Sequence, residues 1–207
     1  MNRTASIRIK GINIQSVLEN LPFLLLLFLA VSFVLAGVLS LNNSTYAELS
    51  AELFNKYTDI RKESRFLNSY LKVLFTSVKY PLISFLCGTS VLGILFSPFT
   101  VCYTGFCYGL LAGYIHINFG ITGIVFNIFV LLIPSVIVML CLIFSAKNCF
   151  TFSSRVARLC TKEARPLNLY YEFRFLCLKH LLLLIPLLVS TLIDTSMFML
   201  FQKYLNI

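Results

Sequence analysis

The sequence predicts an all-α protein, a polytopic transmembrane bundle of about five spans with an amphipathic helix in its outer loop. The first observation is composition: 58% of the 207 residues are hydrophobic, 12% are charged and the mean hydropathy is +0.88. Soluble domains average ~45–50% apolar and ~25% charged residues. The second is that the apolar residues come in blocks of roughly membrane-spanning length. Together they exclude an ordinary soluble enzyme, a disordered tail and a disulfide scaffold.

Charge and cysteine placement narrow the class of protein further. The sequence has 17 Lys and Arg against eight Asp and Glu, and all the basic residues except Lys203 lie in three islands at 3–10, 56–79 and 147–179 that flank the apolar blocks. Such a distribution favours orientation signals over nucleic-acid binding, so we expect membrane lipid and no nucleic acid as a partner. The seven cysteines show no metal-site spacing, and most fall in apolar blocks as small hydrophobes.

The first element is a segment, 1–20, that carries basic residues and leads into an apolar run at 21–41. About 20 residues at ~1.5 Å each cross a ~30 Å hydrocarbon core. A signal peptide would have an apolar region of only ~7–15 residues. We therefore predict an uncleaved first span at 21–41.

The second element, 42–80, is polar but has apolar residues at three- and four-residue steps and no Pro or Gly between 42 and 79. This pattern predicts one amphipathic helix. Its apolar stripe could face the membrane interface, a partner helix or the bundle itself. The candidate partner surface on it consists of Leu53, Tyr57, Ile60, Leu67 and Leu71.

The region 81–145 is predicted to hold spans 2 to 4. Ser97-Pro98 separates apolar runs at 82–96 and 99–117, which predicts a helical hairpin turning at the proline; a single long tilted helix is the alternative. A second turn is expected at 118–120, before an apolar run at 121–144.

The last elements are a basic segment at 146–179, a fifth span at 180–201 and a tail at 202–207. In the basic segment Arg165-Pro166 predicts a break, and the basic-aromatic piece after it suits the inner membrane surface or a docking partner. The positive-inside rule places this segment and the amino terminus in the cytoplasm, so we expect a multi-pass protein of the cell membrane with its carboxyl terminus outside.

Small residues inside the spans indicate close helix packing. Gly105, Gly109 and Gly113 recur every four residues, the spacing that lets two helix backbones approach, within one bundle more often than in a dimer. Helix-packing roles are expected for Gly105, Gly109, Gly113, Gly120, Gly123 and Pro134.

Two polar residues inside the spans stand out, Asn127 and Asp194. Asn127 is expected to hydrogen-bond a neighbouring helix. Asp194 is the one acidic residue in a predicted span, and such residues face a bundle interior or water. No cation occupies the centre of another predicted span, so we expect nearby Ser and Thr hydroxyls or solvent as its partners. A transporter with a polar path through both residues is the alternative function.

No catalytic chemistry is predicted. His116 and His180 fall at the ends of spans assigned to opposite sides, too far apart for a shared metal. The sequence contains no His-Glu-x-x-His helix, phosphate-binding glycine loop or Gly-x-Ser-x-Gly elbow. We therefore expect no enzyme activity, no metal and no cofactor.

The order of motifs between 85 and 145 carries a family resemblance. A Gly-containing span and hairpin (Gly88, Gly93) precede a Gly-Phe-x-x-Gly-x-x-x-Gly helix (Gly105-Phe106, Gly109, Gly113), then a Gly-x-x-Gly turn (Gly120, Gly123) and an Ile133-Pro134 step. This region, about a third of the chain, resembles the core of the stage II sporulation protein M family. The chain departs from the family at one step: the polar pair that often follows the proline there is replaced here by Ser135-Val136.

The resemblance implies a non-enzymatic membrane scaffold of endospore-forming bacteria that acts during forespore engulfment. Its expected partners are peptidoglycan hydrolases resembling stage II sporulation proteins D and P. Their contacts are expected on the outer helix and at the outer ends of the spans.

Overall fold

The computed structural model describes residues 8–9, 12–41, 44–62, 65–160 and 169–202. The expected break at Arg165-Pro166 and most of the tail at 202–207 lie outside these residues. The all-α prediction is confirmed; beside the helices, the described part holds one two-residue antiparallel pair, β1 (Arg8–Ile9) with β2 (Ile12–Asn13).

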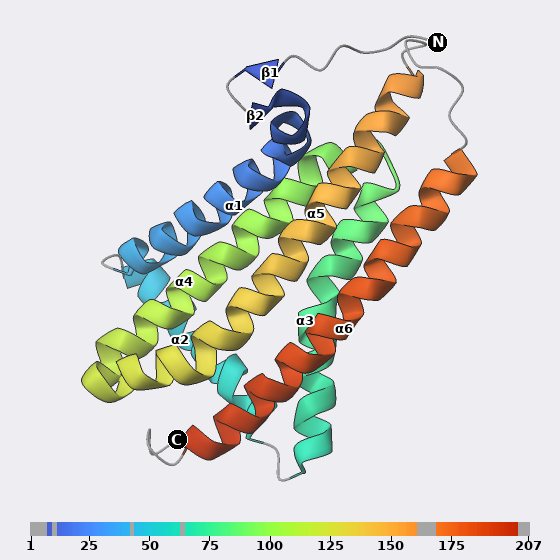
Figure 1. Cartoon of the computed structure of the whole chain (residues 1–207). Helices are drawn as coiled ribbons and strands as arrows, with labels where there is room; N and C mark the ends of the chain where they lie inside the picture. The colour runs from blue at the N-terminus through green and yellow to red at the C-terminus, as the bar shows by residue number, and fades with distance from the viewer. Residues whose placement is uncertain (1–7, 10–11, 42–43, 63–64, 161–168, 203–207) are drawn as a thin grey trace.

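Figure 1 shows the helices as a bundle of long rods. Their bounds are α1 Ile14–Ser40, α2 Ser44–Arg61, α3 Phe66–Gly88, α4 Gly93–Phe126, the π-helix η1 Asn127–Leu132, α5 Ile133–Cys160 and α6 Leu169–Phe201. We call the end with α2, the Gly120 reversal and the last turn of α6 the α2 end. The opposite end, with β1 and β2, is the β1 end.

The chain reverses direction inside α4 at Gly120, within the turn expected at 118–120. Gly120 has φ 54° and ψ −128°, a conformation that L side chains rarely adopt. Beyond it the chain runs back along α4, where the Asn127 side-chain amide donates to the Ala112 carbonyl at 2.8 Å. Residues 93–119 and 121–160 are therefore two antiparallel rods.

The rods are long and apolar enough to cross a membrane. Candidate spans cover Pro22–Ser40, Phe66–Gly88, Gly93–Ala157 and Leu169–Phe201, and the third contains the Gly120 reversal. Large apolar side chains such as Phe28, Phe75 and Leu95 are exposed on the outside of the bundle. A surface of this kind belongs in lipid, so the chain is a multi-pass membrane protein.

The expected hairpin turn at Ser97-Pro98 is wrong. α3 ends at Gly88 and α4 begins at Gly93, so the turn occupies residues 89–92 and Pro98 lies inside α4. A Cβ on Gly93 would clash with Gly88, so glycine permits this tight turn. Pro98 is the sixth residue of α4 and has no N–H to donate to the Ile94 carbonyl, so it removes one backbone hydrogen bond without ending the helix.

The expected single amphipathic helix over 42–80 is also wrong. α2 ends at Arg61, a new helix begins at Phe66, and this α3 continues through Pro81 as the second span. The sequence between the two helices, Lys-Glu-Ser-Arg, offers no apolar residue to continue the stripe. At the corner the Ser69 hydroxyl donates to the Arg61 carbonyl at 3.4 Å. The amphipathic helix before the second span is therefore α2 alone.

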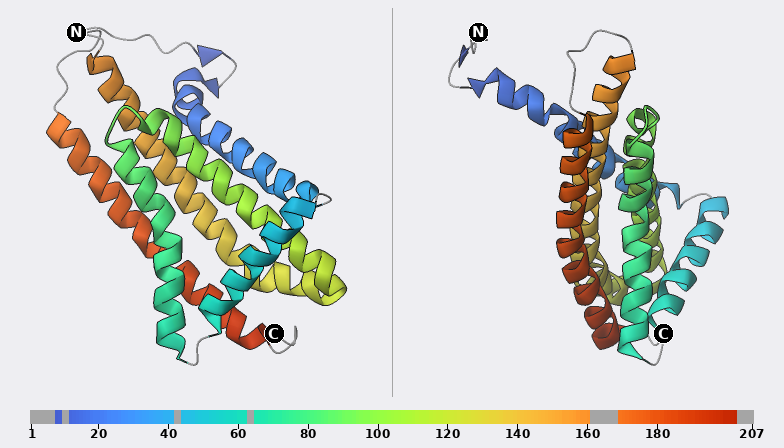
Figure 2. Two further views of the ribbon diagram at one scale, coloured as in Figure 1. Left: turned by 180° about the vertical axis from the view of Figure 1, so that it is seen from behind. Right: turned by 90° about the vertical axis from the view of Figure 1, so that its right-hand side faces the viewer.

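Helix α2 lies across its end of the bundle, as the two views of Figure 2 show. Phe54 of α2 is buried against the rings of Tyr114 and Phe119, with centroid distances of 5.2 and 5.6 Å. It belongs to a core cluster that also contains Phe126 and Phe198. The sequence left three surfaces that the apolar stripe of α2 could face. The structure packs it on the bundle of its own chain.

Candidate functional site

A buried ion pair joins α2 to α6 at the α2 end. Arg61, the last residue of α2, donates from Nε to Oδ1 of Asp194 at 3.2 Å and from Nη2 to Oδ2 in a shorter second bond. Their side chains are only 10% and 11% exposed. A bidentate guanidinium-carboxylate pair is both strong and geometrically specific, so it fixes the carboxyl end of α2 on α6.

Tyr57, one helical turn before Arg61, completes the site. Its hydroxyl donates to Oδ1 of Asp194 at 3.2 Å, and the Arg61 guanidinium lies 3.5 Å from the centre of its ring. Burial raises the pKa of Tyr57 well above its ordinary value, although the Arg61 guanidinium lowers it, so the hydroxyl keeps its proton and donates. The Asp194 carboxylate thus accepts hydrogen bonds from two residues of α2.

The expectation that Ser and Thr hydroxyls or solvent would be the partners of Asp194 is wrong. Ser190, Thr191 and Thr195 are buried beside it, but their hydroxyls donate to the backbone carbonyls of Pro134, Leu187 and Thr191. Sequence reasoning missed Arg61 because it looked for a cation within the other spans. Arg61 instead reaches Asp194 from α2, 133 residues away along the chain.

Aromatic rings enclose the ion pair on the bundle side. Phe198, one turn after Asp194, packs against Tyr57 and Phe126 at centroid distances of 6.0 and 6.1 Å. Aromatic packing keeps the surroundings apolar and strengthens the attraction between the charges. Chemically, the arrangement is an ion pair without net charge that joins α2 to α6.

Asn127 and Pro134 lie where the returning rod contacts its neighbours. Asn127 opens the π-helix η1, and its side-chain oxygen is buried with no hydrogen-bond partner among the described residues. The wider turn of a π-helix fits here because Pro134 has no backbone N–H to donate to the Val130 carbonyl, four residues earlier. The Pro134 carbonyl accepts the Ser190 hydroxyl at 3.0 Å. The two residues thus connect this rod to α4 and α6.

Of the glycines expected to pack helices, Gly105 and Gly109 face backbone and Gly113 faces the Leu41 side chain. A Cβ on Gly105 would lie 3.0 Å from the Ala30 carbonyl oxygen, and one on Gly109 or Gly113 would clash with Val34 or Leu41 of the first span. The stripe therefore faces α1, inside one molecule. Gly123 faces the Ile115 carbonyl across the Gly120 reversal. The expectation is wrong for Gly120, because a Cβ there would meet nothing within 4 Å and the residue serves the reversal instead.

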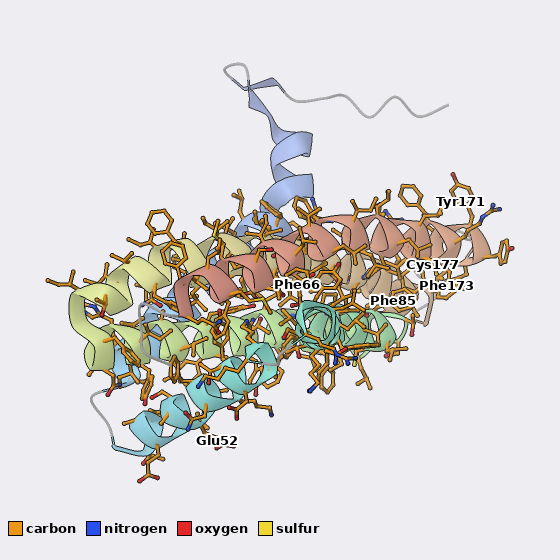
Figure 3. The ribbon with its side chains drawn as sticks, turned by 90° about the horizontal axis from the view of Figure 1, so that it is seen from below. Glu52, Phe66, Phe85, Tyr171, Phe173 and Cys177 are labelled. Carbon is orange, nitrogen blue, oxygen red and sulfur yellow. The ribbon has the colours of Figure 1, made fainter. Side chains whose placement is uncertain are left out.

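The five residues of the candidate partner surface are divided between two helices. Leu53, Tyr57 and Ile60 on α2 are half-buried, whereas Leu67 and Leu71 on α3 are exposed. The opposite face of α2 is polar, and Figure 3 shows Glu52 on it pointing away from the bundle.

His180 forms a second polar cluster nearer the β1 end. Its Nε2 lies 2.9 Å from the Ser145 hydroxyl and 3.5 Å from Cys149 Sγ, and its Nδ1 lies 3.0 Å from the Leu176 carbonyl. Ser145 and Cys149 are fully buried, so the cluster joins α5 to α6. Among the described residues, no group of three His, Cys, Asp or Glu is placed to hold a metal.

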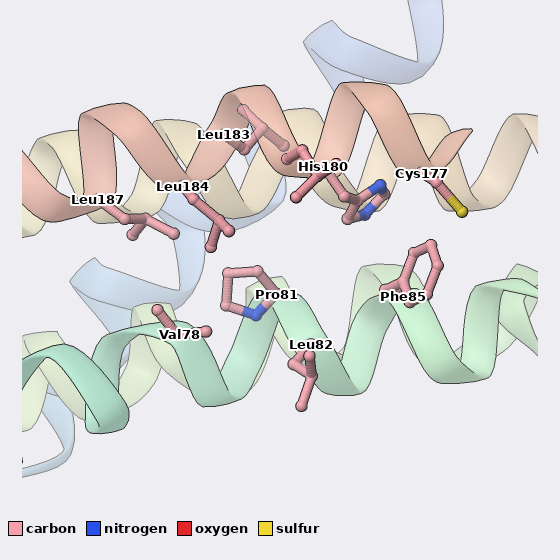
Figure 4. A pocket seen from close by; sticks show the side chains of 10 residues that line it. Val78, Pro81, Leu82, Phe85, Cys177, His180, Leu183, Leu184 and Leu187 are labelled. Atoms are coloured by element: carbon pink, nitrogen blue, oxygen red, sulfur yellow. The ribbon is translucent and has the colours of Figure 1, made fainter. Parts of the chain in front are cut away.

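The His180 ring also lines an apolar groove of about 220 Å³ between α3 and α6, shown in Figure 4. Val78, Pro81, Phe85 and Leu184 make this groove almost wholly apolar. Asn127 and Asp194 line neither this groove nor a larger basic one between α5 and α6.

No protein-family model matches the chain, and neither a curated protein nor a solved structure matches it. The resemblance to the stage II sporulation protein M family therefore rests on the motifs between 85 and 145.

Proposed function

We propose that the chain is a non-enzymatic membrane scaffold in which α2 is a fixed platform for protein partners. The observation that carries this proposal is the bidentate Arg61–Asp194 pair, which holds the carboxyl end of the amphipathic helix α2 on the bundle. Buried charges are costly, and their best attested use is to specify one arrangement. Here the arrangement they specify is the docked position of α2.

The outward face of α2 supports this role. Glu48, Glu52, Lys56 and Asp59 recur along one exposed face, while Phe54, Thr58 and Arg61 are buried beneath it. A partner that binds a helix already held in place pays little ordering entropy. The acidic excess on this face favours a partner with a basic surface.

The proposed orientation puts α2 outside the cell membrane and the β1 end in the cytoplasm, following the basic residues of the amino terminus and of 147–179. With the family resemblance, this makes peptidoglycan hydrolases resembling stage II sporulation proteins D and P the proposed partners, and forespore engulfment the proposed process.

The test is co-purification of the tagged full-length protein from detergent extracts of sporulating cells, with cell-wall hydrolases quantified by mass spectrometry. A triple reversal, Glu48→Lys with Glu52→Lys and Asp59→Lys, should lower hydrolase recovery at least tenfold. Reversal of Arg174, exposed near the β1 end, to Glu should leave recovery unchanged.

Thermal stability in detergent should be the same for the wild type, the triple variant and Arg174→Glu, because every changed side chain is exposed. Undiminished hydrolase recovery from the triple variant would contradict the proposal. Recovery of a nucleotide-binding subunit in place of hydrolases would favour the transporter.

A further inference from the structure

A basic groove of about 620 Å³ lies between α5 and α6 at the β1 end and reaches Pro22 of α1. This volume is in the range of ligand cavities, ~300–1,000 Å³. The charged residues that line it are Lys147, Arg155, Glu172 and Lys179. The platform on α2 lies at the other end of the bundle, so ligand binding in this groove is independent of the proposed function.

The groove has an excess of positive charge. Nη1 of Arg155 donates to Glu172 and joins α5 to α6 at one side, so the acidic residue in the lining is neutralised. Lys179 is held with its Nζ 3.4 Å from Asn148 Oδ1 and 4.4 Å from the Phe175 ring centre. Among the described residues that line the groove there are three cations and one carboxylate, a balance that favours an anion.

The groove lies at the depth of lipid headgroups. Lys147 comes just after the apolar run at 121–144, and Lys179 just before the apolar stretch that begins at Leu181. Pro22 begins the candidate span of α1. Below the cations the outer surface is apolar, with Phe28 and Leu182 exposed. An anion bound here thus lies beside a surface that suits acyl chains.

We propose that this groove binds the phosphate headgroup of an anionic glycerophospholipid. Lys147 of α5, whose Nζ lies 5.8 Å from the Phe23 ring centre, and Lys179 of α6 both line the groove and would contact the phosphate. Asn148 and Thr151 add polar groups for the rest of the headgroup. Basic pockets between spanning helices at the membrane surface recognise lipids of this class.

Native mass spectrometry of the full-length protein in detergent tests the proposal, with phosphatidylglycerol, phosphatidylcholine and inorganic phosphate as probes. The wild type should bind phosphatidylglycerol more tightly than phosphatidylcholine. The double variant Lys147→Gln with Lys179→Gln should lose affinity for phosphatidylglycerol by roughly thirtyfold, as expected for two lysines near an anionic headgroup.

The matched control is Lys56→Gln with Lys62→Gln, two exposed lysines at the α2 end, and it should bind like the wild type within about twofold. Lys147→Arg with Lys179→Arg should retain binding, which separates lost charge from misfolding. Equal affinity for the two lipids, equal loss in the control, loss in the arginine variant, or displacement of the lipid by inorganic phosphate at equal concentration would each overturn the proposal.

Discussion

At the scale of single residues, the ion pair under α2 determines the arrangement more than the stability. Moving Arg61 and Asp194 out of water costs several kcal/mol for each ion, and their mutual attraction with the Tyr57 hydrogen bond only offsets that cost. Each charge is therefore tolerated because the other is present.

This interdependence predicts a non-additive pair of substitutions. Arg61→Met or Asp194→Leu alone leaves one buried charge without its partner and should lower the free energy of unfolding by about 3–5 kcal/mol. The double variant removes both charges and should recover most of that loss. Thermal or denaturant unfolding in detergent measures all four proteins as a double-mutant cycle.

Lys56→Met serves as the control, because Lys56 is exposed on the same helix and should change stability by no more than about 0.5 kcal/mol. A double variant as unstable as the sum of the two single variants would show that the charges do not depend on each other.

At the scale of elements, α1 and α4 approach closely because glycine removes the side chains between them. Gly37 of α1 faces the Phe106 carbonyl, and Gly109 faces the carbonyl of Val34. Within a membrane, close packing of this kind replaces the hydrophobic drive that joins helices in water.

We predict that Gly109→Ala destabilises the bundle although alanine is the better helix former. Intrinsic propensity favours alanine by about 1 kcal/mol, but the added Cβ would meet backbone of α1, which cannot move aside as a side chain does. Separation of the helices should cost about 1–3 kcal/mol net. A lower unfolding temperature in detergent measures it.

Phe99→Leu, at an exposed position of the same helix, should leave the unfolding temperature almost unchanged. If Gly109→Ala raises that temperature, α1 and α4 do not pack through this glycine.

At the scale of the whole molecule, the two ends of the bundle differ in charge. At the α2 end Arg61 and Asp194 neutralise each other inside, and the exposed face of α2 is mixed but acidic in excess. The β1 end carries the basic groove. The positive-inside rule counts only Lys and Arg, of which the amino terminus and 147–179 together hold ten and 42–80 holds six.

The arrangement of rods predicts opposite sidedness for two positions. Residues 56 and 170 are separated by α3 and by the two rods on either side of Gly120, an odd number of crossings. In a cysteine-free background, Lys56→Cys should react with a membrane-impermeant maleimide in intact cells. Tyr170→Cys, also exposed, should react only after permeabilisation.

Both cysteines should react equally once the membrane is dissolved. Labelling of both positions in intact cells would contradict three crossings between them, and labelling of residue 170 alone would reverse the proposed orientation.

The sequence by itself determined the all-α class, the apolar spans and the reversal near Gly120. These features depend on local properties, namely hydropathy over a span and the backbone freedom of glycine. It also indicated the faces of the helices, since Gly105, Gly109 and Gly113 share one side of α4 whatever they contact.

Only the tertiary structure decided where the second span begins, how α2 lies and what neutralises Asp194. The apolar stripe of 42–80 continues in the sequence across a corner that the chain makes between Arg61 and Phe66. Asp194 finds its cation 133 residues away, on a helix outside the spans. Such pairing depends on which helices pack side by side, and periodicity within one helix contains no information about its neighbour.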